Sequence, residues 1–131
     1  MIVAGVGCRR GAPAPDIEAA VRAALARANI ATGALDVIAT IAAKRGEAGI
    51  QAAAEKLGVS VVVVADADVK TAIDRTETRS ERVLALAGVP SVAEAAALAA
   101  AGPASRLISP RLVVGAATCA LAASGQTPRD A

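Results

Sequence analysis

Short apolar runs recur along the first half of the chain, separated by stretches that mix apolar and polar residues. The runs at 2–7, 35–41 and 59–65 each have the length and branched residues of a strand. The third is almost continuous in valine, which is typical of a central parallel strand buried on both faces. Strands separated in this way by longer segments predict a mostly parallel sheet.

The segments between these runs carry the spacing of amphipathic helices. A helix is predicted from about Pro15-Asp16, with Glu18 and Arg22 paired one turn apart on its outer face. A second is predicted over 47–57, and Gly58 follows it in the position where a left-handed residue ends a helix. The apolar positions predicted to face the core in the first helix are Ile17, Val21, Ala24, Leu25 and Ala28.

The second half predicts two further helices. Asp66 is a candidate N-cap for a short helix that runs to about Asp74. The segment 76–86 shows no clean period and predicts no element. Ser91 and Glu94 form a capping box, with Glu94 in the third helical position, and that helix should run to Ala101 before Gly102-Pro103.

The end of the chain predicts two strands, 106–109 and 112–119, that form a hairpin around Pro110. Residues 124–131 read as a frayed tail. There is no internal repeat and no linker, so residues 1–131 are expected to form a single domain. The predicted class is α/β: a three-layer α/β/α arrangement, with a mostly parallel sheet of about five strands and a C-terminal antiparallel hairpin.

Composition changes this picture in one respect. Of the 131 residues, 37 are alanine and none is Phe, Tyr or Trp, so the core must be built from Val, Ile, Leu and Ala. Small side chains bury less area each. The interior must therefore be filled by a close approach of helices to the sheet.

Charge and hydropathy exclude two classes of partner. With 14 basic and 12 acidic residues and no aromatic side chain to stack a base, the chain lacks the features of a nucleic-acid binder. Its longest apolar run, 112–123, is shorter than the roughly 20 residues that cross a bilayer. The N-terminus shows no secretion signal, and a cytoplasmic protein with free thiols is expected.

The first candidate site is the turn after the first strand, Gly5 to Gly11, because open α/β sheets bind ligands at the carboxyl ends of their strands. Arg9 and Arg10 can each hold a carboxylate or phosphate through two hydrogen bonds, while Gly7 and Gly11 permit a tight turn. We expect both arginine side chains to be accessible. A solvated turn without a ligand is the alternative.

Cys8 lies in the same turn, where neighbouring arginines could lower its pKa and make it a nucleophile. The chain contains no histidine to act as its base. Packing behind the turn is therefore favoured for Cys8. The other cysteine, Cys119, is far away in sequence and the two show no metal-binding spacing, so no metal and no cofactor are predicted.

The second candidate site follows the second strand, at Thr40, Lys44 and Glu47. If the first two strands are neighbours, Lys44 and Arg45 would join Arg9 and Arg10 in a group of four cations. Glu47 has two possible roles. It is either a general acid–base group, or an acidic residue in the first helical turn that interacts favourably with the helix dipole.

Ser91 and Glu94 form the third candidate site. A helix cap explains both residues, and the N-terminus of a helix can also bind an anion.

Three motifs in order resemble the family formed by CobE and the C-terminal domain of CbiG, both of cobalamin (vitamin B12) biosynthesis. The motifs are GVGCRRG at 5–11, TIAAKRGE at 40–47 before Gly49-Ile50, and GVPSVAEAAA at 88–97. The resemblance extends from Ile2 to about Ala122.

This resemblance implies a protein that binds or helps to process a precorrin or corrinoid intermediate, with another enzyme of the pathway as a further partner. An alternative is the activity of full-length CbiG, which opens the ring-A lactone of cobalt-precorrin-5A. These 131 residues include no counterpart of the large N-terminal part of that protein. A further alternative is a non-catalytic subunit that positions a pathway enzyme. The substrate-binding residues expected from the motifs are Gly7, Cys8, Arg9, Arg10, Gly11, Thr40, Lys44, Glu47, Ser91 and Glu94.

Overall fold

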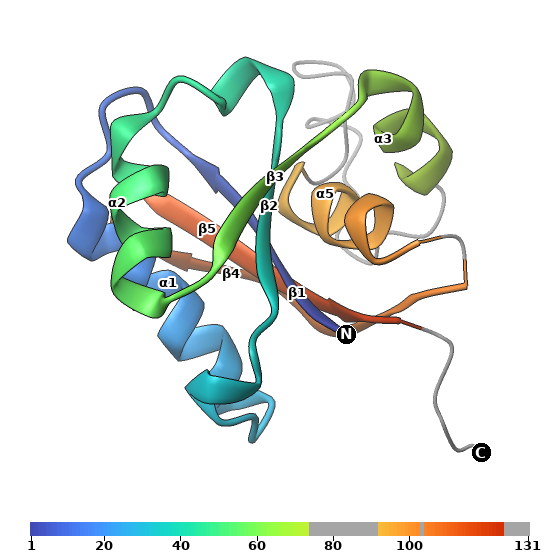
Figure 1. Ribbon diagram of the computed structural model, residues 1–131, viewed down its shortest axis with the longest axis horizontal. Helices are drawn as coiled ribbons and strands as arrows, with labels where there is room; N and C mark the ends of the chain where they lie inside the picture. Colours follow the sequence, from blue (N-terminus) through green and yellow to red (C-terminus); the bar gives the residue numbers. More distant parts are fainter. Residues whose placement is uncertain (74–91, 103, 125–131) are drawn as a thin grey trace.

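One five-stranded sheet forms the centre of the protein, in the order β3-β2-β1-β5-β4 (Figure 1). The computed structural model describes residues 1–73, 92–102 and 104–124. β1, β2 and β3 are parallel, whereas β5 runs antiparallel to both β1 and β4. This confirms the predicted α/β class with an antiparallel C-terminal hairpin. The strands are β1 (Ile2–Cys8), β2 (Val37–Ile41), β3 (Ser60–Val64), β4 (Arg106–Val114) and β5 (Ala117–Ala123).

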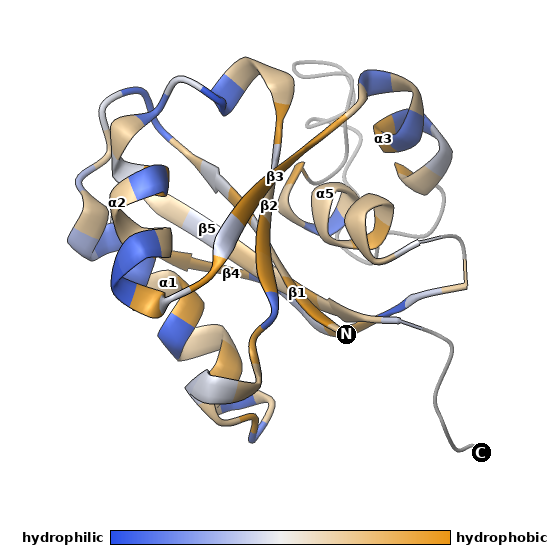
Figure 2. Cartoon of the chain, in the orientation of Figure 1, coloured by the Kyte–Doolittle hydropathy of each residue, from blue (hydrophilic) through white to orange (hydrophobic). Residues whose placement is uncertain are grey.

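Helices cover both faces of the sheet and complete the predicted three layers (Figure 1). α1 (Ala14–Arg27) and α2 (Ala48–Leu57) pack on one face, and α3 (Asp66–Ala72) and α5 (Val92–Ala101) on the other. Figure 2 shows hydrophilic residues on the outer sides of α1 and α2, and hydrophobic ones along the strands. No helix in the described ranges is long and apolar enough to span a membrane.

The α5 helix lies unusually close to the central strand. A Cβ placed on Gly5 of β1 would lie only 2.0 Å from the carbonyl oxygen of Ala93 and 2.6 Å from the backbone nitrogen of Ala97. The face of α5 at this contact is alanine, and both alanines are fully or almost fully buried. Glycine facing alanine therefore produces the close helix-to-sheet approach that an aromatic-free composition requires.

Local helix signals are confirmed where one face is clearly apolar. Glu18 and Arg22 form an ion pair of 2.8 Å on the outer face of α1, and Gly58 ends α2 with a φ of 73°. The predicted cap at Asp66 is wrong. Asp66 is the first residue of α3, Ala65 occupies the cap position, and no side chain caps the helix. An acid in this first turn still interacts favourably with the helix dipole.

The predicted place of the valine-rich strand is also wrong. Among the described strands β3 lies at an edge, and the central strand is β1, which pairs with β2 on one side and β5 on the other. Val62 and Val63 of β3 are 39% and 40% exposed. A run of valines shows that a segment is extended, but it does not determine the order of strands in the sheet.

Pro110 is not the turn of the C-terminal hairpin. β4 continues through it with two shifts of register against β5, and the turn is at Gly115-Ala116. Because β4 is an edge strand, a proline at an irregular position breaks little of the hydrogen-bond ladder.

Two charged side chains brace this irregular part of β4, one from each side of the sheet. Arg27 of α1 donates from Nε and Nη2 to Ser109 Oγ, at 3.1 and 2.6 Å, and also to the carbonyl oxygen of Pro110. Glu94 of α5 accepts the Arg111 backbone N–H at 2.9 Å. These hydrogen bonds stabilise β4 where its ladder with β5 is interrupted.

Three expectations fall on residues outside the described ranges. They concern the segment 76–86, the cap at Ser91 and the tail beyond Ser124.

Candidate functional site

The carboxyl ends of β1 and β2 lie side by side, because these strands are parallel neighbours. The chain leaves β1 through Arg9, Arg10 and Gly11, and leaves β2 through the short η2 helix (Ala42–Lys44) and a turn to α2. We call the residues Cys8–Gly11 and Lys44–Glu47 the rim. The sequence predicted that Lys44 and Arg45 would join Arg9 and Arg10 if the first two strands are neighbours. β1 and β2 are neighbours.

Hydrogen bonds hold the Arg9–Gly11 loop. Arg9 donates its backbone N–H to Ala116 in the β4–β5 turn at 2.9 Å. Gly11, with a φ of 73°, donates its N–H to Glu47 Oε1 at 2.9 Å. The N–H groups of Arg9 and Gly11 are therefore engaged within the protein. The side chains of the loop are therefore the main groups that can bind an anion.

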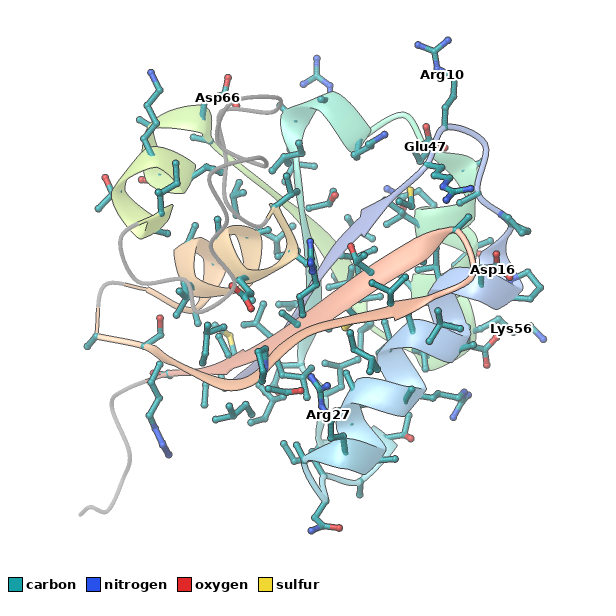
Figure 3. All side chains as sticks on the ribbon, turned by 180° about the vertical axis from the view of Figure 1, so that it is seen from behind. Arg10, Asp16, Arg27, Glu47, Lys56 and Asp66 are labelled. Carbon is teal, nitrogen blue, oxygen red and sulfur yellow. The ribbon has the colours of Figure 1, made fainter. Side chains whose placement is uncertain are left out.

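The arginines of the loop are accessible, as predicted. Arg9, Arg10 and Arg45 are exposed and Lys44 is half-buried. In Figure 3, Arg10 projects outward from its loop, and Glu47 lies on the side toward the body of the protein. None of these four cations forms a salt bridge with a described residue. The rim thus presents positive charge to solvent.

Glu47 has a structural task that the sequence did not predict. It occupies the cap position of α2, yet its side chain makes no capping bond to that helix. Its carboxylate instead accepts from Gly11 and so connects the two segments of the rim. The approach is close, since a Cβ on Gly49 would lie 2.3 Å from the carbonyl oxygen of Ala12.

Cys8 is not an activated thiol. Partial burial and the Glu47 carboxylate both raise its pKa above the ordinary value, and Lys44 only partly opposes them. Burial raises the pKa of Cys119 to about 12. Since the thiolate is the nucleophile, neither cysteine has the low pKa of a catalytic one.

These shifts predict how the thiols react with an alkylating agent. Because a raised pKa lowers the thiolate fraction at a given pH, the alkylation rate of Cys8 should rise at a higher pH than that of an unstructured cysteine peptide. Glu47→Gln should move the profile toward lower pH, while Cys119 should react only after unfolding. Mass spectrometry of the two labelled peptides across pH gives both rates. A Cys8 profile unaffected by Glu47→Gln would contradict the assigned cause.

Three of the expected binding residues lie inside the protein. Thr40 is fully buried, and its Oγ1 donates to the carbonyl oxygen of Val6 at 3.0 Å. Glu94 is also fully buried. Gly7 is buried within β1, beside the first turn of α5. Ser91 lies outside the described residues. The structure therefore brings together the residues of the rim, and places Gly7, Thr40 and Glu94 beneath the surface.

The sequence analysis missed the β4–β5 turn as a neighbour of the rim. Asp16, in the first turn of α1, accepts the Ala116 N–H at 3.0 Å, and the carbonyl oxygen of Ala116 in turn accepts from Arg9. Gly115, with a φ of 57°, was the available signal for this turn. No group of three or more metal-ligating side chains occurs in the described ranges.

Known proteins resemble this chain over nearly its whole length. The model of the family "Cobalamin synthesis G C-terminus" matches residues 2–122. A Protein CobE from Sinorhizobium sp is 38% identical over 121 residues, which are 92% of this chain and 79% of that protein.

Solved structures of proteins with cobalamin-related names are also similar to this chain. The crystal structure of CobE, a protein from the cobalamin biosynthetic pathway, superposes with a TM-score of 0.83 at 34% identity, over 93% of this chain and 89% of the other. Cobalamin biosynthesis protein chiG from Agrobacterium tumefaciens str. C58 gives 0.76 at 44% identity, over 96% and 100%. The chain thus belongs to the cobalamin synthesis G C-terminus family, the one that its three motifs resemble.

Proposed function

We propose that this protein binds a precorrin or corrinoid intermediate of cobalamin biosynthesis at the rim and helps its processing. The observation that carries the proposal is the group of four cations, Arg9, Arg10, Lys44 and Arg45, that are unpaired among the described residues at the ends of two adjacent strands. The names of two similar solved structures place those proteins in this pathway.

The chemistry of the ligand matches these side chains. Precorrins carry several acetate and propionate carboxylates around an apolar ring. A guanidinium group can hold a carboxylate through two parallel hydrogen bonds, which a lysine ammonium cannot reproduce. Because the N–H groups of Arg9 and Gly11 are already bonded, the two exposed arginines are the principal donors toward these carboxylates.

Binding is better supported than lactone hydrolysis. The thiol of Cys8 has a raised pKa, and one oxygen of Glu47 is bonded to Gly11. Cys8 is therefore not prepared as a nucleophile, and Glu47 already has a structural contact. A cytoplasmic location is part of the proposal and is compatible with two cysteines that are both free.

The test is titration of the protein with a precorrin. Replacing both Arg9 and Arg10 by alanine should weaken binding by at least about tenfold, because a hydrogen bond to a charged group contributes about 1.5–3 kcal/mol. Affinity should also fall as salt rises to physiological strength. Since the chain has no aromatic residue, absorbance in the near ultraviolet and visible reports the pigment.

Two further variants separate charge from geometry and location. Arg9→Lys with Arg10→Lys keeps the charge but removes the planar fork, so its affinity should lie between those of the wild type and the alanine variant. Arg106→Ala removes an exposed arginine at the start of β4, the opposite end of the sheet from the rim, and should leave affinity unchanged. Equal affinity for all forms would place the ligand elsewhere.

A further inference from the structure

The Arg9–Gly11 loop is held by hydrogen bonds although it lies at the surface. Ala12 donates its N–H to the carbonyl oxygen of Arg9 at 3.0 Å, which closes a four-residue turn with Arg10 and Gly11 at its centre. Gly11 has a φ of 73°, a conformation that favours glycine at the third position of such a turn. Two further N–H groups of the loop donate to acceptors outside the turn. The protein itself therefore fixes the backbone that carries the two arginines.

Two carboxylates provide the outer part of this support. Glu47 Oε1 accepts the Gly11 N–H at 2.9 Å. Asp16 acts through Ala116 in the β4–β5 turn: its Oδ2 accepts the Ala116 N–H at 3.0 Å. The carbonyl oxygen of Ala116 then accepts the Arg9 N–H at 2.9 Å. One acid therefore secures each end of the loop.

These two acids lie close to the cations of the rim but do not pair with them. Asp16 and Glu47 are half-buried, and within the described ranges neither forms a salt bridge. Figure 3 shows Arg10 projecting outward, with Glu47 and Asp16 below it in this view. A negative charge near a site for carboxylates weakens binding through repulsion. The contribution that these acids can make to binding is therefore their hydrogen bonds.

We infer that Asp16 and Glu47 are positioning residues for anion binding at the rim. They hold the Arg9–Gly11 loop in one conformation before a ligand arrives, so the loop does not have to be ordered on binding. Neither acid contacts the ligand, and each acts through the loop. The inference rests on the proposed function, because it assigns both acids to the site proposed for a polycarboxylated ligand.

Precorrin titration of four variants separates the charge of each acid from its hydrogen bond. Asp16→Ala and Glu47→Ala remove both, and each should weaken binding at least about fivefold because the loop loses its preorganisation. Asp16→Asn and Glu47→Gln remove the charge but keep an acceptor oxygen, so they should bind at least as tightly as the wild type. An effect of charge alone would instead strengthen binding in all four. The control is Glu55→Ala, an exposed acid in the last turn of α2, which should leave affinity unchanged.

Gly115→Ala tests the contact of Asp16 without changing any charge. Gly115 has a φ of 57°, and a Cβ there would lie 2.6 Å from Asp16 Oδ2. The variant should displace this carboxylate and weaken binding about as much as Asp16→Ala does. Its matched control is Gly58→Ala, because Gly58 has a φ of 73° but a Cβ there meets nothing within 4 Å. Equal affinities for the two glycine variants would remove Asp16 from the inference, and the melting temperature verifies that every variant folds.

Two readouts without precorrin separate failure of this inference from failure of the proposed function. Hydrogen exchange of the Gly11 amide should be slow in the wild type and in Glu47→Gln, and fast in Glu47→Ala. Citrate, a small tricarboxylate followed through the arginine side-chain NMR signals, should bind the variants in the same order of affinity as precorrin. If citrate follows this order but precorrin does not bind, the proposed ligand is wrong and the positioning role stands. Alanine variants that bind as tightly as the amide variants, a Gly11 amide that exchanges freely in the wild type, or binding of neither probe would overturn the inference.

Discussion

Replacing Gly5 by alanine is expected to destabilise the protein by about 3 kcal/mol, the upper part of the usual range for an overfilled core. The added Cβ would lie 2.0 Å from the Ala93 carbonyl oxygen and 2.6 Å from the Ala97 nitrogen. Both are backbone atoms of α5, so no side chain can rotate to relieve the contact. The helix would have to move away from the central strand.

Urea unfolding followed by far-ultraviolet circular dichroism measures this loss. The matched control is Gly33→Ala, since a Cβ on Gly33 meets nothing within 4 Å. That variant should remain within about 0.5 kcal/mol of the wild type. Equal stabilities for the two variants would mean that α5 does not lie against β1 as described.

Glu94→Ala is expected to cost about 3 kcal/mol. The side chain is fully buried, and one of its oxygens accepts the Arg111 N–H at the irregular part of β4. A hydrogen bond to a charged acceptor contributes about 1.5–3 kcal/mol, and the truncation leaves the partly buried Arg111 N–H without this partner. The cavity adds to the loss.

The conservative variant Glu94→Gln keeps an acceptor oxygen and should lose less stability than Glu94→Ala. Glu55→Ala, on the exposed side of α2, serves as the control and should change stability by no more than about 0.5 kcal/mol. If Glu94→Ala unfolds at the same urea concentration as the wild type, Glu94 is not a structural link between α5 and β4.

The sequence predicted those elements in which one local pattern determines the answer. In α1 the apolar positions fall on a single face, and Ile17, Val21, Ala24 and Leu25 are buried as expected. The C-terminal glycine of α2 was recognised for an equally local reason, its left-handed conformation. The helices and the number of layers follow from such signals.

Strand order and turn position depended on contacts between distant segments. The valine run of β3 indicated an extended segment. It did not indicate that this segment lies at the edge of the described sheet. Pro110 suggested a turn because proline usually interrupts a ladder. Bonds from Arg27 and Glu94 allow β4 to continue through it. Neither partner is close to Pro110 in sequence.

The same distinction applies to the candidate site. The cations of the rim were predicted from their place after two strands, and the exposure of Arg9 and Arg10 is confirmed. Thr40 was placed by the same reasoning, but its side chain faces the buried α1 and α2 side, where it bonds to Val6. Sequence position identified the edge of the sheet, while the direction of each side chain required the pairing of β1 with β2.

The pairing of β1 with β5 has a consequence for synthesis on the ribosome. β1 is made before the other described strands of the sheet and becomes its centre, and its partner on one side consists of residues 117–123. Until those residues leave the exit tunnel, one edge of β1 has no partner from β5. Pairings between such distant segments form slowly, because a long loop must close first. The nascent chain therefore carries an apolar strand with one open edge until β5 has been made, a period in which chaperone binding would protect it from aggregation.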